Sequence, residues 1–313
     1  MITRVSFKNM TPDEWIAQRR KTIGGSDAAT VLGLNEYSSP YSLWCEKTGI
    51  IVPEDISDKE AVRLGHDLEE YVAKRWMEKT GKKLRRDNNF VYNSKYPFAH
   101  VQADRLVVGE NAGFEAKTTS SWEIYEQCRA GEIPPRFYCQ CVHGMMVTGA
   151  EKWYLGVLVL GKGFYAFEIA RDEAEIEALA NAEREFWYNV TNNIAPPLDG
   201  TEATQGALKT ILADSAPGTA VDLTGVSMHL SLYTALNDKI KGLENELAEH
   251  QAHIMQYMGE AEKGTFDKTS VSFKTQTRQI FDRKAFEADH GEIPEIYFNT
   301  STSRPFKVTT RKR

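Results

Sequence analysis

The stretch AHVQADRLVVGENAGFEAKTT, residues 99–119, decides the fold. An apolar run leads into a segment rich in glycine and polar residues at 109–113, and a second run follows it, so the stretch predicts two paired strands joined by a turn. With the turn at 109–113, Asp104 and Glu115 lie roughly opposite each other, about 5 Å apart at Cβ. The stretch is therefore expected to bring two carboxylates together.

The segment FEAKTT adds a lysine to these carboxylates. Alternate side chains of a strand share a face, so Glu115 and Lys117 point one way while Phe114 and Ala116 point the other. Two neighbouring carboxylates repel each other unless a cation lies between them. Their hard oxygen atoms suit Mg²⁺, which binds through one or two carboxylates and keeps waters for a substrate phosphate.

This arrangement predicts a catalytic centre. Asp104, Glu115 and the main-chain carbonyl of Ala116 would hold the metal, which polarises a phosphoryl oxygen and lowers the pKa of a bound water. Lys117 would orient or deprotonate the attacking water, or stabilise charge in the transition state. The alternative is a surface hairpin with a Glu–Lys pair, which is the stronger interpretation of this pattern taken alone.

A third carboxylate supports the centre. The apolar spacing over 59–80 predicts a helix, in which Glu69, Val72 and Trp76 share one face while Glu70 looks outward. A buried, unpaired carboxylate is costly, and a metal site is one way to stabilise it. A structural ion pair between Glu69 and an arginine is the alternative.

Two other segments offer contacts to a phosphate or to water. Gln140 lies on a helix expected after the Pro-Pro step at 134–135, where it would position the nucleophilic water or a phosphate; a capping or core amide would look the same. Near the N-terminus, cations precede a Gly-Gly turn at 24–25 and a short helix starting near Ser26. Free helix amides, a hydroxyl and guanidinium groups suit an anion. The alternative is that Ser26 only caps the helix and the arginines are solvated.

The rest of the chain divides into three regions. Strands and helices alternate through 1–195, with an apolar hairpin over 152–170 and a charged helix over 172–193, which predicts an α/β domain. Residues 196–222 are rich in Pro, Gly, Thr, Ala and Asp and predict a linker. Residues 223–313 predict an α+β extension.

That extension contains a long amphipathic helix. Its apolar residues keep a 4-3 spacing, with His250 filling one slot, and they are Leu236, Ile240, Leu243, Leu247, Ile254 and Tyr257. Strand-like runs follow at 271–281 and 306–310. The basic end would either contact phosphates or form a solvated tail, and its cations are Arg304, Lys307, Arg311, Lys312 and Arg313.

Composition limits the class of protein. The 313 residues are 41% hydrophobic, which excludes global disorder, and the net charge of −6 argues against a protein that coats nucleic acid through bulk positive charge. The four cysteines have no CxxC pair or zinc-ligand spacing, so we expect them to be reduced and mostly buried. The sequence contains no signal peptide or membrane span, and we expect a soluble, cytoplasmic protein.

Taken together, the segments resemble the YqaJ family of viral recombinases, in the phage lambda exonuclease branch of the PD-(D/E)XK nuclease superfamily. The resemblance extends over roughly 13–190. Its motifs are W-x3-R-x4-GGSDAA-x2-LG-x3-Y-x2-P-x2-LW-x2-KTG (15–49), G-x2-LE (65–69), the Asp104 strand, the ExK strand, Y-x-Q (138–140), and VTG with the aromatic-rich strand after it (147–154).

This resemblance implies an α/β core with a mixed central sheet and Mg²⁺ dependence, with Mn²⁺ expected to substitute. It also implies 5′→3′ digestion of one strand of a DNA duplex, which leaves 3′ single strands for recombination. By position, Asp104, Glu115 and Lys117 match the nuclease core, Glu69 and Gln140 its supporting residues, and Arg19 with Ser26 a site for the terminal 5′-phosphate. Some family members form ring-shaped trimers, and they work with a single-strand annealing protein, so the resemblance implies both a homo-oligomer and such a partner.

Two alternatives stay open at this point. One is another enzyme on the same core, either an endonuclease or a RecB-like nuclease with an iron–sulfur cluster, although the four cysteines fit a cluster poorly. The other is a non-catalytic DNA-binding or annealing module, which has no need of Asp104, Glu115 and Lys117 in this pattern and for which more positive charge is expected.

Overall fold

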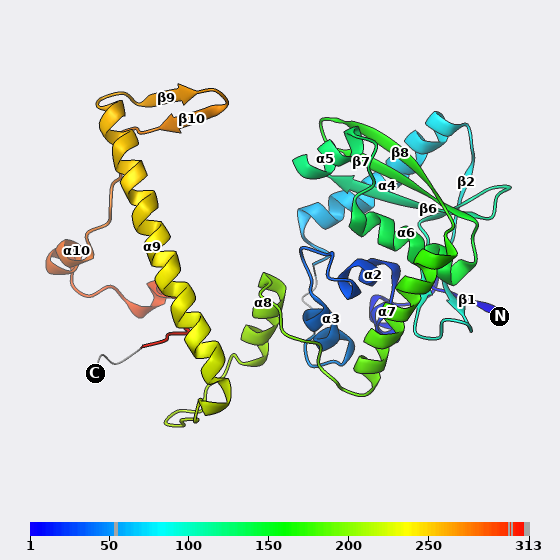
Figure 1. The fold of residues 1–313 in the computed structure, drawn as a ribbon, viewed down its shortest axis with the longest axis horizontal. Coiled ribbons are helices and arrows are strands. Elements are labelled where there is room, and N and C mark those ends of the chain that lie inside the picture. Colours follow the sequence, from blue (N-terminus) through cyan, green and yellow to red (C-terminus); the bar gives the residue numbers. More distant parts are fainter. Residues whose placement is uncertain (53–55, 300, 302, 310–313) are drawn as a thin grey trace. The chain divides into compact units, whose positions relative to one another are not determined.

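A five-stranded mixed sheet forms the centre of the N-terminal part of the chain (Figure 1). The computed structural model describes residues 1–52, 56–299, 301 and 303–309. The chain divides into two units, Met1–Leu212 and Ala213–Arg313. The sheet runs in the order β2 (Leu84–Arg86), β5 (Arg105–Val107), β6 (Ala112–Thr119), β7 (Lys152–Val159) and β8 (Gly163–Ala170). In this sheet β6 and β7 pair in parallel, and the other neighbours pair antiparallel.

Strands β6 and β7 are the buried middle of this sheet. Alternate residues of β7 enter two separate apolar clusters: Trp153, Leu155 and Val157 enter one, and Tyr154 enters the other. A strand covered on both faces has to be apolar almost throughout, which explains the sequence WYLGVLVL. The predicted hairpin over 152–170 and the mixed α/β class are confirmed.

Helices cover both faces of the sheet (Figure 1). On one face, Val72 and Trp76 of α4 (Glu60–Thr80) pack with Phe114 and Tyr154. The other face is covered by α6 (Pro135–Thr148) and α7 (Glu173–Thr191), which share the larger cluster with β7. The helix predicted over 59–80 is confirmed, and Gly81 ends it in the left-handed conformation at φ 71°.

Smaller elements surround this layer. A second sheet has the order β1 (Ile2–Ser6), β3 (Asn89–Asn93) and β4 (His100–Val101). The remaining helices of the first unit are α1 (Pro12–Arg20), α2 (Gly25–Val31), α3 (Pro40–Lys47), α5 (Trp122–Arg129) and α8 (Glu202–Ile211). The opening helix is confirmed, with Thr11 as its N-cap. Helix α2 begins at Gly25, one residue before the expected start.

The segment interpreted as a linker, 196–222, is not a linker throughout. Residues Glu202–Ile211 form α8, which belongs to the first unit. The hydroxyl of Thr201 caps the helix, and Thr204 and Ala207 are buried. The hydroxyl oxygens of Thr204 and Ser39, at the start of α3, share a buried hydrogen bond of 2.7 Å. Small and polar residues make this contact, so the composition does not distinguish it from a linker.

The second unit contains the long helix that was expected. Helix α9 spans Ser227–Met258 and is followed by a hairpin of β9 (Lys263–Phe266) and β10 (Thr269–Ser272), then by α10 (Arg283–His290). The sequence predicts strands at 271–281 and 306–310. This prediction is wrong after Ser272, because the described residues beyond it form no strand. Position 310 lies outside them, as do Arg311, Lys312 and Arg313 of the basic end. No strand in the described chain pairs with the residues from 273 onward, so these residues do not form a strand despite their β-propensity.

Two other expectations are tested directly. All four cysteines are free and buried. Among the described residues, no helix combines the length and the apolar character needed to cross a bilayer.

Gly113 of β6 lies against the Trp153 ring with no room for a side chain. A Cβ atom built there lies 2.4 Å from the indole ring of Trp153, which is fully buried. We expect Gly113→Ala to lower the free energy of unfolding by about 1–3 kcal/mol or more, because the indole has no room to withdraw. Urea unfolding checks this, with Gly65→Ala in α4 as the control. Nothing lies within 4 Å of the added methyl there, so the control should be neutral or stabilising by up to about 1 kcal/mol.

Candidate active site

The candidate site lies where β5 begins, beside the middle of β6. Arg105 pairs with Phe114 in the ladder, and continuing this register by one residue places Asp104 beside Glu115, as the sequence predicts. Asp104 itself is not in a strand, since β5 starts one residue later. Its Oδ2 instead accepts a hydrogen bond of 2.8 Å from the backbone amide of Ala116.

Glu115 is the centre of the hydrogen bonding. Its Oε1 accepts bonds from Lys117 Nζ at 2.7 Å and from Gln140 Nε2 at 2.5 Å. The Glu115 side chain is only 5% exposed and that of Lys117 is 24% exposed. Phe114, the residue before Glu115, points into the α4 cluster. The expected alternation is confirmed, and the surface-hairpin alternative does not describe this buried pair.

Burial and charge set the ionisation of the three groups. Burial, then the neighbouring Glu115, raises the pKa of Asp104 well above its ordinary value. Burial also raises the pKa of Glu115, despite the opposing effect of Lys117. Burial alone would lower the pKa of Lys117, but the Glu115 and Asp104 carboxylates raise it above its ordinary value. Lys117 is therefore an ammonium group, suited to stabilise negative charge and unsuited to take up a proton.

Glu69 is not an unpaired carboxylate. It forms an ion pair with Arg105, whose side chain is 8% exposed and also bonds Glu70 at 3.0 Å. Arg105 pairs with Phe114 across the ladder and so shares its face, toward α4, whereas Asp104 and Glu115 point the other way. The structure therefore contains the alternative in which Glu69 forms a structural ion pair with an arginine. The negative charge of Glu69 still raises the pKa of Asp104.

Arg105 is a residue that the sequence interpretation missed. Its guanidinium also donates to the carbonyl oxygen of Asp104 at 2.6 Å. Because this bond and the Glu69 and Glu70 ion pairs meet in one side chain, Arg105 anchors the backbone of Asp104 to α4. The only sequence signal was a cation beside the key aspartate.

The oxygen atoms at the site fit a hard divalent cation. Asp104, which is partly buried, and Glu115, which is buried, are two carboxylates whose raised pKa values follow from loss of solvent and from neighbouring carboxylates, both of which a bound cation would offset. Among the described residues there is no group of three or more His, Cys, Asp or Glu side chains placed to hold a metal ion. Two carboxylates and a main-chain carbonyl are nevertheless compatible with Mg²⁺, since this ion keeps several waters.

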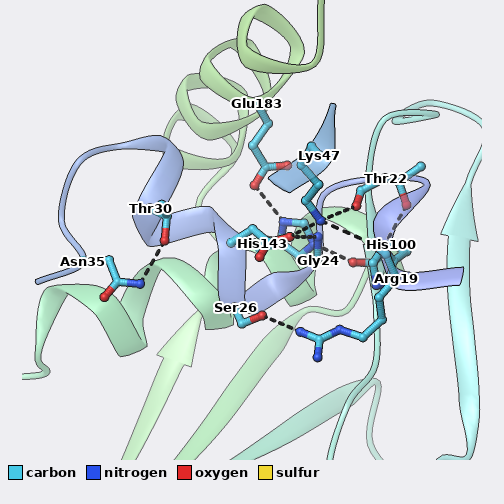
Figure 2. A network of polar contacts seen from close by, with 11 residues as sticks. Arg19, Thr22, Gly24, Ser26, Thr30, Asn35, Lys47, His100, His143 and Glu183 are labelled. Carbon is cyan, nitrogen blue, oxygen red and sulfur yellow. Dashed lines mark hydrogen bonds and ion pairs between the residues drawn. The ribbon is translucent and has the colours of Figure 1, made fainter. Parts of the chain in front are cut away.

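Arg19 and Ser26 lie together in the N-terminal segment (Figure 2). An Nη atom of Arg19 donates to Ser26 Oγ at 3.0 Å, and the guanidinium stacks 4.7 Å from the centre of the Trp15 ring. Ser26 is the second residue of α2 and not its N-cap, which is Gly24. The pair that the resemblance indicates is therefore formed by direct contact, so Arg19 is not simply solvated.

The Gly-Gly turn connects this pair to the helix of Gln140. A Cβ at Gly25 would lie 3.3 Å from Cγ of Gln140, and one at Gly24 would lie 3.1 Å from Cε1 of His100. Both glycines therefore allow a close approach of backbone to side chain; neither has a positive φ. The turn packs directly against the residue of α6 that bonds Glu115.

A buried polar network supports the turn (Figure 2). His143, one turn after Gln140, bonds Glu183 of α7 at 2.7 Å and the carbonyl oxygen of His100 at 2.8 Å. Lys47 contacts Asp27 at 2.7 Å and the carbonyl oxygen of Thr22 at 3.0 Å. Asp27 and Lys47 belong to the motif over 15–49, but the sequence assigned no role to any residue of this network, because each is a common polar residue whose role depends on contacts between distant segments.

Comparison with known proteins matches the part of the chain that contains the site. Residues 14–151 match the model of the YqaJ-like viral recombinase domain. The Bacillus subtilis (strain 168) protein YqaJ is 35% identical over 302 residues, which cover 95% of this chain and 93% of that protein.

Solved structures are similar to this chain at lower identity. An alkaline exonuclease (LHK-Exo) from Laribacter hongkongensis is 20% identical with a TM-score of 0.49, covering 58% of this chain and 94% of that chain. A phage-related exonuclease from Haemophilus somnus 129PT is 10% identical with a TM-score of 0.42, covering 58% of this chain and 100% of that one.

Proposed function

Since the chain belongs to the YqaJ-like viral recombinase family, we propose that it is a metal-dependent DNA nuclease with its active site at Asp104, Glu115 and Lys117. The observation that carries the proposal is the convergence of two carboxylates and an ammonium group, with Glu115 buried and Asp104 and Lys117 partly buried. A binding module has no use for two neighbouring carboxylates that are shielded from water and repel each other, because their placement costs free energy of folding.

The residues divide the work as follows. Asp104, Glu115 and the carbonyl oxygen of Ala116 hold the cation, for which we propose Mg²⁺ with Mn²⁺ as a substitute. When bound, the cation polarises a phosphoryl oxygen and activates water. Lys117 stabilises the negative charge that develops on the phosphoryl oxygens. Gln140 keeps the Glu115 carboxylate in place through its 2.5 Å hydrogen bond.

The substrate we propose is an end of double-stranded DNA with a 5′-phosphate. The chain then digests one strand in the 5′→3′ direction and leaves a 3′ single strand. The guanidinium of Arg19 and the hydroxyl of Ser26 support this proposal. They lie 3.0 Å apart, and both groups can donate hydrogen bonds to a terminal phosphate. A cytoplasmic location, a homo-oligomer and a single-strand annealing partner complete the proposal; the oligomer and the annealing partner derive from the family resemblance alone.

A time course on linear duplex DNA tests the function. Each 5′ and each 3′ end is labelled in a separate preparation and incubated with Mg²⁺ or with chelator. We expect loss of the 5′ label first, only with Mg²⁺, and no cutting of closed circular duplex. Cutting of the circle would favour an endonuclease, and unchanged DNA length in every arm would indicate a binding module.

The 5′-phosphate site has its own test in Arg19→Ala. We expect a drop of about tenfold or more in the preference for 5′-phosphorylated over 5′-hydroxyl ends, because a charge-assisted contact to the phosphate is lost. The preference is measured as the ratio of initial rates on the two substrates. Arg20→Ala, the neighbouring arginine of α1, is the matched control and should keep the ratio. An equal loss of rate on both substrates would place Arg19 on another part of the duplex.

A further inference from the structure

Helix α9 carries a continuous apolar seam. Its 32 residues extend for about 48 Å at 1.5 Å per residue. A strict 4-3 spacing runs along one side, and its members are Leu236, Ile240, Leu243, Leu247, His250, Ile254 and Tyr257. In heptad terms, Ile240, Leu247 and Ile254 occupy a positions and the others occupy d positions.

Within the second unit, this seam is exposed along its whole length. The side chains of Ile240, Leu243 and Leu247 are 52%, 64% and 68% exposed, and every member of the seam is exposed. Helix α9 has no buried residue. Tyr233 contacts Phe306 with ring centroids 5.7 Å apart, before the seam begins. An apolar stripe of this length on a helix in water requires a partner.

We propose that the partner is α9 of a second copy of this chain, in a parallel two-stranded coiled coil. β-branched residues at a with leucine at d favour two strands over three or four. Here Ile240 and Ile254 are at a, and Leu236 and Leu243 are at d. Leu247 at a, and His250 and Tyr257 at d, depart from this pattern, so the preference for two strands rests on Leu236, Ile240, Leu243 and Ile254.

The charges beside the seam select the orientation. In a parallel pair, each g position faces the e position five residues later in the partner, so Lys239 meets Glu244 of the other copy, twice per dimer. In a fully overlapping antiparallel pair, equivalent positions face each other, so Glu244 would meet Glu244 and Glu246 would meet Glu246. Like charges that face each other across an interface are unfavourable, so of these two arrangements the parallel one has the complementary charges.

The parallel register also pairs His250 with His250 of the second copy, which gives a direct test. We expect the full-length His250→Cys variant to form a disulfide-linked pair of chains under mild oxidation. The four natural cysteines are buried and give a low background. Ala252→Cys, on the outer side of the helix, is the control and should stay uncrosslinked. An antiparallel pair would place His250 beside Ile240 of the second copy. In that case the Ile240→Cys/His250→Cys double variant would crosslink and the His250→Cys single variant would not.

Charge reversal provides an independent measurement. We expect Lys239→Glu or Glu244→Lys to raise the dimer dissociation constant about threefold to tenfold, and the double variant to restore it. Leu243→Asp should raise the constant more than about tenfold, with Asn245→Asp as the outward-facing control. A disulfide-linked pair of chains on a denaturing gel shows that two α9 helices have associated. A non-covalent assembly made through residues 1–212 would not survive on such a gel, so the two kinds of association are distinguished. No crosslink at position 250 together with no effect of Leu243→Asp on association would overturn the proposal, as would a crosslink only in the antiparallel double variant.

Discussion

Lys117→Ala is expected to lower the rate of phosphodiester hydrolysis by about 10²–10³-fold while leaving DNA binding nearly unchanged. The reason is that the Lys117 ammonium, held 2.7 Å from Glu115, faces charge that develops only in the transition state. Its pKa is raised by the two carboxylates despite its burial, so the positive charge is present at neutral pH. Single-turnover rates on linear duplex and an independent binding measurement separate the two effects.

Lys152→Ala is the matched control for this variant. Lys152 lies on the neighbouring strand β7 and also contacts a glutamate, with Nζ 2.8 Å from Glu168, but it shares the α4 side of the sheet with Tyr154 and not the side of the site. Its loss should leave turnover within about twofold, since exposed pairs of this kind contribute little. If Lys117→Ala keeps near-normal turnover, or if Lys152→Ala loses as much, then Lys117 does not carry the proposed role.

The sequence was sufficient for the strand that carries the site. One turn segment, 109–113, lies between two apolar runs, so the register that places Asp104 beside Glu115 follows from local pattern alone. The strict alternation in FEAKTT then determines which side chains are buried against α4. Contacts of this kind are short in sequence, and the turn residues limit the possible pairings.

Contacts between distant segments were not predictable in the same way. Whether Glu69 meets a metal or Arg105 depends on which face of the sheet α4 covers, and the periodicity of α4 does not determine that. Helix α8 is held by Thr204 and Ala207 against α3, and small residues give no apolar pattern to detect. In the second unit, Ser272 of β10 pairs with Lys263, the first residue of β9, so β9 has no further strand residue for the chain beyond Ser272 to pair with, whatever its β-propensity.

Asp104→Asn is expected to remove both divalent-cation binding and nuclease activity without unfolding the protein. In the native chain the Ala116 amide donates a hydrogen bond of 2.8 Å to Oδ2 of Asp104. The side-chain oxygen of an asparagine can accept the same bond, so the local structure is retained. What is lost is one of the two carboxylates of the site, and Mg²⁺ binds through such groups. We expect Mg²⁺ affinity to fall at least about tenfold in calorimetry, and hydrolysis to fall with it.

Thermal unfolding with and without Mg²⁺ separates this loss from a loss of folding. A ligand that binds only the folded state raises its stability, so Mg²⁺ should raise the Tm of the native chain and not that of Asp104→Asn. In chelator, the variant should be at least as stable as the native chain, because burial and Glu115 disfavour a charged Asp104 when no cation is bound. Asp172→Ala is the control: Asp172 follows the end of β8 and caps α7 through the amides of Ala174 and Glu175 at 2.8 and 3.1 Å, so this variant should lose stability and keep its Mg²⁺ response. If the Mg²⁺ affinity of Asp104→Asn is unchanged, then Asp104 is not a ligand of the cation. Glu115 would then lack the second carboxylate on which the proposed metal site depends.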